Sequence, residues 1–341
     1  MENYSLLMGA AVMKMAMEMA AVSMEKPSGA LPVSAGAGTD SSPDLGLAMA
    51  AAGSPAHKRC ASVPRQLLLT TGGDHLLRDM AAAAAPLKAA SPTRLAYFDD
   101  MWALRSPATV LSVQQEEGGR RAVVLDATIF HPQGGGQPAD TGVISAATGR
   151  FLVEDVRVKD GVVFHYGRFE DAGGDGCRPE LDKGQTVTLE VDASRRSLNS
   201  RLHSAGHLLD SCMTNLGLQL EPGKGYHFPD GPSVEYKGVI PPDQLQDKKT
   251  QLEKQANELI SKGAKVLVSV FPYEEAAKLC GGALPGYISQ DSTPRIVKFG
   301  EYPGCPCGGT HVADVADIGS LKVTSIRVKK GVTKVSYSIN P

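Results

Sequence analysis

The sequence predicts a mixed α+β protein, in which a small β-barrel domain precedes an α+β domain and a low-complexity tail precedes both. Short β-branched and apolar runs, separated by Gly and Pro about every ten residues, predict the barrel. Helical periodicities that alternate with further strand patterns predict the second domain. The chain has 341 residues and a formal net charge of -2, and this length suits roughly two domains. The predicted boundaries are 1–92 for the tail, 93–190 for the barrel and 191–341 for the α+β domain.

The tail is rich in Ala, Met, Ser, Gly and Pro, and eight of the eleven methionines fall between Met1 and Met49. This composition buries too little apolar surface to offset chain entropy, so we expect the tail to be mostly disordered. It carries too many acidic residues for a typical organelle transit peptide. The sequence from Met80 resembles the N-terminus of a protein, so residues 1–79 are expected to be dispensable for fold and activity. A start at Met80 implies the cytoplasm, whereas a translated tail leaves plastid or mitochondrial targeting open.

The bulk properties of the chain narrow its function class. No apolar stretch reaches the ~18 residues that a membrane-spanning helix needs, so no membrane association is predicted. The near-neutral charge means that any nucleic-acid partner must be bound by a local basic patch. The six cysteines lack the spacing of small secreted proteins, which indicates a reducing compartment. The oligomeric state is not predicted.

The barrel is expected from strand patterns in four segments: 109–114, 122–130, a hairpin over 151–164 that turns at Lys159-Asp160-Gly161, and 186–191. The α+β domain is expected to begin with a helix capped by Asp192, whose core face repeats at helical spacing. The residues of this face are Leu198, Leu202, Leu209, Met213 and Leu216. The later elements are expected at 233–240 (strand), 242–262 (helix), 265–271 (strand), 273–279 (helix), 295–299 (strand) and 320–339 (two strands).

Two pairs of side chains carry the spacing of a metal site. His203 and His207 lie four residues apart on the first helix, which places both imidazoles on one face. Cys307 and His311 are also four residues apart, and two glycines between them let the backbone turn tightly. Thiolate and imidazole are ligands that zinc prefers, so we expect one zinc ion per chain bound by these four residues.

Each pair alone has a simpler explanation. Two histidines at this spacing are usually surface residues or satisfied core residues, and only the presence of both pairs favours a metal. Cys305 is an alternative to Cys307 as the sulfur ligand. The remaining histidines that lack such partners are expected to be non-ligands: His57, His75, His131 and His165.

Four segments resemble one known family. CGGTHV (307–312), with the histidine pair upstream, resembles the editing domain of alanyl-tRNA synthetases and of their free-standing relatives, the AlaX proteins. FHPQGGGQPADTG (130–142) is similar to the glycine-rich signature of that family, and GKGYHFPDGPSVEY (223–236) and IGSLKVTSIRVKKGV (318–332) are similar to its later segments. The editing domain of threonyl-tRNA synthetases is a more distant relative, and it lacks the glycine-rich motif.

The resemblance implies a zinc-dependent hydrolase that removes a wrong amino acid, serine or glycine, from alanine tRNA, and it leaves the preferred amino acid open. It leaves open whether zinc activates water or orients the substrate, and it identifies no general base. No segment upstream of residue 93 suits an ATP-binding catalytic domain, so the chain is not expected to charge tRNA. Two alternatives are a zinc-stabilised tRNA-binding module without catalysis and a relative of alanine–tRNA ligases that lacks the aminoacylation domain.

Three groups of residues are candidates for binding the acceptor end of alanine tRNA. The run Gly134, Gly135, Gly136 and Gln137 exposes backbone amides that suit close approach of an RNA end, although a tight packing loop explains it equally well. Base stacking and phosphate binding, or an ordinary hairpin surface, explain the segment that contains Lys224, Tyr226 and His227. Basic residues of the first helix and the last strands are candidates, as a group, for phosphate contacts, although a solvated charge explains any one of them more simply: Arg195, Arg196, Arg201, Lys322, Arg327, Lys329, Lys330 and Lys334.

Overall fold

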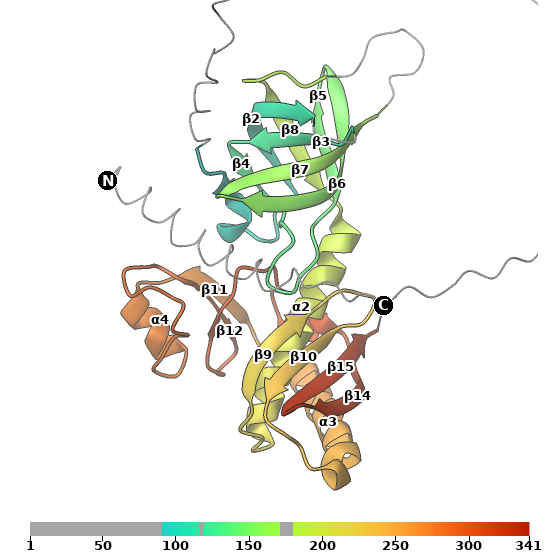
Figure 1. Ribbon diagram of the computed structural model, residues 1–341, viewed down its shortest axis with the longest axis vertical. Helices are drawn as coiled ribbons and strands as arrows, with labels where there is room; N and C mark the ends of the chain where they lie inside the picture. The colour runs from blue at the N-terminus through green and yellow to red at the C-terminus, as the bar shows by residue number, and fades with distance from the viewer. Residues whose placement is uncertain (1–90, 116–118, 171–179, 341) are drawn as a thin grey trace, which may run out of the picture. The chain divides into compact units, whose positions relative to one another are not determined.

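The computed structural model describes residues 91–115, 119–170 and 180–340 (Figure 1). The predicted disorder of the tail and the predicted start at Met80 lie outside these residues, apart from the tail's last two positions. All described residues belong to one compact unit, so the predicted domain boundary between residues 190 and 191 stays a prediction. No helix in the described ranges is both long and apolar enough to cross a membrane.

The first part of the described chain is a closed barrel of six antiparallel strands (Figure 1). Its order is β2, β3, β7, β6, β5 and β8, and β8 pairs with both β5 and β2, so the barrel has no open edge. The strands are β2 (Arg105–Gln115), β3 (Arg121–Leu125), β5 (Gly142–Ala146), β6 (Gly149–Lys159), β7 (Val162–Phe169) and β8 (Thr186–Val191). Apolar side chains that include Val110, Leu125, Phe151 and Leu189 fill the interior. The predicted barrel is confirmed.

Most of the predicted barrel strands are confirmed, and one is wrong. The hairpin between β6 and β7 turns at Asp160 and Gly161, whose φ angles are 48° and 79°, as a two-residue turn requires. The segment 122–130 is not one strand, because β3 ends at Leu125 and β4 (Ala127–Thr128) pairs instead with β1 (Arg94–Leu95). The cause is Asp126, whose carboxylate accepts hydrogen bonds from the backbone amides of Thr109 and Ala127 and turns the chain.

The second part begins with α2 (Ala193–Asn215), and Asp192 caps it by accepting a hydrogen bond from the Arg195 amide at 3.0 Å. Two sheets follow, with strand orders β14-β15-β10-β9 and β11-β12-β13. Their strands are β9 (Glu221–Tyr226), β10 (Ser233–Lys237), β11 (Val266–Val270), β12 (Arg295–Phe299), β13 (Cys305–Pro306), β14 (Leu321–Lys329) and β15 (Val332–Ile339). The other helices are α3 (Leu245–Lys262) and α4 (Tyr273–Leu279), and 3-10 turns occupy Ala96–Phe98, Pro242–Gln244 and Val315–Ile318. This mixture confirms the predicted α+β class.

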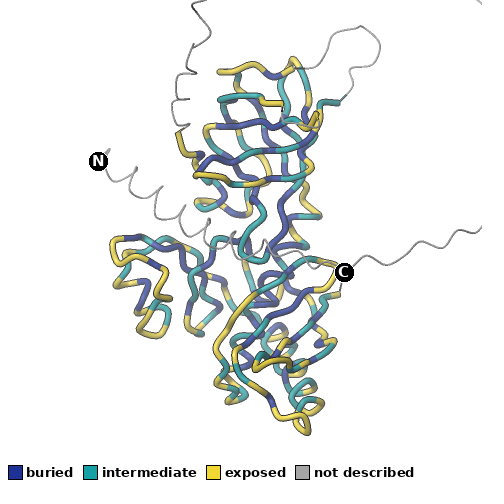
Figure 2. Tube along the Cα trace, in the orientation of Figure 1, coloured by how far each residue is buried: buried dark blue, intermediate teal, exposed yellow. Residues whose placement is uncertain are grey.

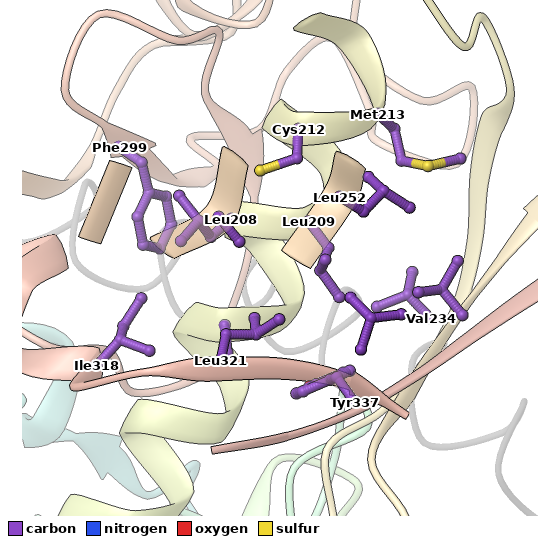
Figure 3. Packing of buried hydrophobic residues seen from close by; sticks show 14 of the residues in the cluster. Leu208, Leu209, Cys212, Met213, Val234, Leu252, Phe299, Ile318, Leu321 and Tyr337 are labelled. Atoms are coloured by element: carbon purple, nitrogen blue, oxygen red, sulfur yellow. The ribbon is translucent and has the colours of Figure 1, made fainter. Parts of the chain in front are cut away.

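One apolar core holds α2 and α3 against the four-stranded sheet. Figure 3 shows Leu208, Leu209 and Met213 of α2 packed with Leu252 of α3 and Tyr337 of β15, and Figure 2 marks much of α2 as buried. The predicted core face of α2 is confirmed, with its two end residues only partly buried. The strand predicted at 233–240 ends at residue 237, and the helix predicted at 242–262 starts with a 3-10 turn because prolines precede it.

A buried ion pair joins the start of α2 to the segment after the glycine-rich turn. Arg196 is 4% exposed, and its Nη2 donates to Asp140 Oδ2 at 2.6 Å. Its guanidinium also donates to the carbonyls of Met101 and Ile129 at 2.7 and 2.6 Å, and Asp140 accepts a further hydrogen bond from the His131 amide. The prediction that Arg196 reaches tRNA phosphates is therefore wrong, because this guanidinium is buried and bonded within the protein.

Candidate metal centre

The four predicted ligands come together. His203 and His207 lie on α2, Cys307 and His311 follow β13, and one ligand atom from each lies within 4.8 Å of the other three. The Cys307 Sγ atom is 3.6 Å from His203 Nε2 and 3.3 Å from His311 Nε2. Ligand bonds of the usual zinc lengths at tetrahedral angles separate sulfur and nitrogen by about 3.6 Å. The group therefore has the size that a small ion with mixed ligands requires.

The Nδ1 atom of each of the three histidines has a partner and is the outer nitrogen of the group, which leaves Nε2, the inner nitrogen, for a metal. His203 Nδ1 lies 2.8 Å from Gln137 Oε1, and His311 Nδ1 lies 3.2 Å from Ser204 Oγ. His207 Nδ1 lies 3.2 Å from Cys305 Sγ, while its Nε2 is buried without a hydrogen-bond partner. Such outer partners fix the tautomer and the ring orientation of metal-binding histidines. A buried and unpaired Nε2 is the arrangement that a bound ion would satisfy.

The glycine-rich run is a tight turn that presents Gln137. Gly134 and Gln137 exchange backbone hydrogen bonds at 3.1 and 2.9 Å, and Gly135 and Gly136 have φ angles of 57° and 79°, which favour glycine. The Gln137 Oε1 atom also accepts from the Thr310 amide, so this oxygen must receive the proton of His203 Nδ1. The turn thus has a packing role.

The electrostatics of the group keep its histidines neutral. Burial lowers the pKa of His207 to about 4, and it lowers the pKa values of His203 and His311 well below the usual range. Neutral imidazole is the form that binds metals. Burial raises the pKa of the Cys307 thiol, and Arg295 and the Gly309 amide oppose this rise. Metal binding would therefore release the thiol proton.

Sequence patterns did not indicate a role for Arg295, which supports the ligand loop, the segment 307–311 that carries Cys307 and His311. It is 1% exposed and donates to the carbonyl oxygens of Cys307 and Gly309 at 2.8 and 2.9 Å. Its guanidinium carbon lies 4.9 Å from the ring centroid of Phe98. An arginine in a short strand pattern resembles any surface arginine, so only the tertiary contacts reveal this role.

A cavity of about 420 Å³ opens onto the ligands. Its wall includes three of them, His203, His207 and Cys307, together with residues from β9, β10 and the segment before β13. Two residues predicted to bind substrate, Gly135 and His227, also line it. The buried His227 ring stacks on His203 at 4.5 Å, and its Nδ1 atom donates to Tyr337 Oη at 2.7 Å.

The other candidate substrate residues lie outside the cavity wall. Lys224 is exposed on β9. The Tyr226 ring stacks on Phe228 with a centroid distance of 4.6 Å, and its hydroxyl donates to Asp230. Arg201 donates to the backbone carbonyl of Ile318, an intramolecular contact. Their roles in binding tRNA stay predictions.

The two glycines of the ligand loop are expected to differ in their tolerance of a methyl group. Neither has a positive φ, but a Cβ on Gly309 would overlap the His203 ring and lie 2.8 Å from Gln137 Oε1. A Cβ on Gly308 would meet only Phe98, at 3.8 Å. Gly309→Ala is therefore expected to lower metal affinity at least about tenfold, because it displaces His203 and its outer partner.

Gly308→Ala is the matched control and is expected to change stability by less than about 0.5 kcal/mol. Competition with a chromophoric zinc chelator measures both affinities. Equal affinities for the two variants would contradict the packing explanation.

Comparison with known proteins agrees with the site. Residues 91–195 match the family described as tRNA synthetases class II (A), and residues 295–335 match the threonyl and alanyl tRNA synthetase second additional domain. The second match contains Cys307 and His311. The chain is 32% identical over 231 residues to the alanyl-tRNA editing protein AlaX-L of Pyrococcus horikoshii, covering 67% of this chain and 53% of that protein.

Alanine–tRNA ligases match as well. The chain is 32% identical over 261 residues to the ligase of Methanosarcina acetivorans, covering 75% of this chain and 26% of the ligase. The ligase of Halobacterium salinarum is 31% identical over 274 residues, which are 78% of this chain and 27% of that protein. The chain thus spans about half the length of AlaX-L and about a quarter of the ligases. The chain belongs to the family of alanyl-tRNA editing proteins, which it shares with the matching region of alanine–tRNA ligases.

Proposed function

We propose that the protein is an aminoacyl-tRNA deacylase that removes serine, and also glycine, from wrongly charged alanine tRNA with the help of one bound zinc ion. The observation that carries the proposal is the convergence of His203, His207, Cys307 and His311, three of which line a cavity, in a chain of the alanyl-tRNA editing family. The ligand outside the cavity wall is His311. The cavity volume of about 420 Å³ suits an amino acid and part of a terminal nucleoside.

The donor set fits zinc better than other metals. Three imidazole nitrogens and one sulfur would supply the four ligands of a closed zinc site, and no methionine stands at ligand spacing within either motif, as copper sites often require. Bound zinc would supply either a Lewis acid for the ester or an anchor that orients it. Four protein ligands leave no open position, which favours orientation unless one ligand loosens. Gln137 keeps His203 in position, and the neutral His227 presents its second ring nitrogen near the cavity.

The partner is proposed to be the acceptor end of alanine tRNA, approached over the outer face of the four-stranded sheet. Arg327 and Lys334 are direct cross-strand partners, an arrangement in which like charges repel. Neither residue forms an ion pair with any residue in the described ranges, and the same holds for Lys322, Lys329 and Lys330. RNA phosphates would relieve this repulsion. In the same sheet, the edge strand β9 lines the cavity.

Deacylation of alanine tRNA charged with serine, glycine or alanine tests the proposal. We expect the metal-loaded protein to hydrolyse the seryl ester at least about 100-fold faster than the alanyl ester, because a polar group that binds the serine hydroxyl is left unpaired by alanine. Release of labelled amino acid measures the rates. Equal rates on the seryl and alanyl esters would contradict an editing role, and tRNA binding without any hydrolysis would favour the non-catalytic alternative.

ATP-dependent attachment of alanine to tRNA is not expected. An aminoacylation assay with the pure full-length chain, with an alanine–tRNA ligase as the positive control, checks this point.

A further inference from the structure

One carboxylate faces the cavity beside the metal centre. Asp210 follows His207 by three residues on α2, so the two side chains share a helix face. The Asp210 side chain is 31% exposed, and its Oδ1 atom accepts a hydrogen bond from the Tyr236 hydroxyl at 2.8 Å. Its Oδ2 atom lies 3.9 Å from His207 Nδ1, which is longer than a hydrogen bond. Tyr236 thus orients the carboxylate, and one of its oxygens stays available toward the cavity.

The described part of the cavity wall offers this carboxylate no lysine or arginine as a partner. Among the described residues that form the wall, Asp210 is the only acidic one, and none is Lys or Arg. A partly enclosed carboxylate without a counterion is costly. A ligand with a positively charged group would therefore gain affinity at this position.

The position of Asp210 argues against two other roles. Cys305 Sγ lies closer to His207 Nδ1, at 3.2 Å, than Asp210 Oδ2 does at 3.9 Å, so Asp210 is not the nearest support of this ligand. Asp210 lies toward Nδ1 of the ring, whereas His207 is left with Nε2 to turn toward the other ligands. The Asp210 carboxylate is therefore badly placed to act on a group bound at the centre of the four ligands.

We propose that Asp210, oriented by Tyr236, binds the protonated α-amino group of the amino acid esterified to tRNA. The inference rests on the proposed deacylase function, because only that function brings an amino acid ester into this cavity. The α-amino group is the one cationic group that every aminoacyl ester carries. Asp210 would then recognise an amino acid as such, and the choice between serine and alanine would depend on other groups.

The test compares two esters that differ only in the α-substituent. Nitrous acid converts seryl-tRNA into its glyceryl analogue, which replaces the amino group with a hydroxyl and keeps the serine side chain. We expect Asp210→Asn to lower kcat/KM for the seryl ester by about 10- to 100-fold, the loss of one charge-assisted hydrogen bond, and to leave the glyceryl ester within about threefold. Tyr236→Phe, which keeps the carboxylate but not its orienting hydroxyl, is expected to show a smaller loss with the same selectivity.

Glu258→Gln, which removes an exposed carboxylate of α3 outside the cavity wall, is the matched control and should treat both esters as the wild type does. Calorimetric binding of an adenosine analogue, with serine linked to its 3′ position through an amide, gives a readout that needs no turnover. We expect Asp210→Asn to weaken this binding by the same factor as it lowers kcat/KM, with zinc content unchanged.

Equal losses on the seryl and glyceryl esters would overturn the inference, because Asp210 would then act on the side-chain hydroxyl or on the fold. Loss of zinc from Asp210→Asn would also overturn it, in favour of a role in supporting His207. A wild-type protein that hydrolyses neither ester would instead refute the proposed function.

Discussion

Cys307→Ser is expected to lower the zinc content of the purified protein from about one ion per chain to below about 0.1, and to lower the deacylation rate at least about 100-fold. The reason is that Cys307 supplies the only sulfur of the four-ligand group, and its Sγ lies 3.3 and 3.6 Å from two of the ligand nitrogens. A serine hydroxyl neither ionises nor binds zinc as a thiolate does. Elemental analysis and the seryl-ester assay measure the two effects.

Two further cysteine variants sharpen this experiment. Cys280→Ser, at the end of α4, lies outside the four-ligand group and should keep both zinc and activity. Cys305→Ser separates the two candidate sulfur ligands, because Cys305 contacts the Nδ1 atom of His207 and does not belong to the group. We expect it to retain zinc. Full zinc in a His203→Ala, Cys307→Ala double variant would contradict the assignment.

Short-range patterns predicted the parts of the molecule that depend on local geometry. The helix capped by Asp192 was predictable because its cap and its core face lie within one segment. The histidine pair was predictable for the same reason, since four-residue spacing on a helix fixes side chains on a common face. The pair of Cys307 and His311 was predictable because the glycines between them let the chain turn. That both pairs would meet is a tertiary fact. It was predictable only because both pairs offer ligands that a single zinc ion can bind.

The rest depends on contacts between distant segments, which no local pattern encodes. Gln137 and His203 are 66 positions apart, and Asp210 meets Tyr236 across 26 positions. A charged residue on a predicted helix looks the same whether it faces water or a buried partner, which is why Arg196 was misassigned to tRNA. The Gly309 backbone, by contrast, was correctly linked to the site but for another reason: its missing side chain makes room for His203.

Arg196→Ala is expected to lower the free energy of unfolding by about 3–5 kcal/mol, the range for a buried ion pair that loses one partner. The variant would leave the Asp140 carboxylate, whose side chain is 0% exposed, without its counterion. It would also leave the carbonyl oxygens of Met101 and Ile129 without this donor. Urea unfolding followed by circular dichroism measures the loss.

The neighbouring Arg195→Ala is the control, because Arg195 is half-buried and its side chain donates a single hydrogen bond, to the Ala139 carbonyl. Its loss is expected to be about 1 kcal/mol. An Arg196→Met, Asp140→Leu double variant should be less destabilised than the sum of its single variants, since it removes both charges together. Because His203 follows Arg196 by two helical turns on α2, Arg196→Ala should also weaken zinc binding. A loss of less than about 1 kcal/mol for Arg196→Ala would mean that water already reaches Asp140. The ion pair would then not be what holds α2, the helix of His203 and His207, in place.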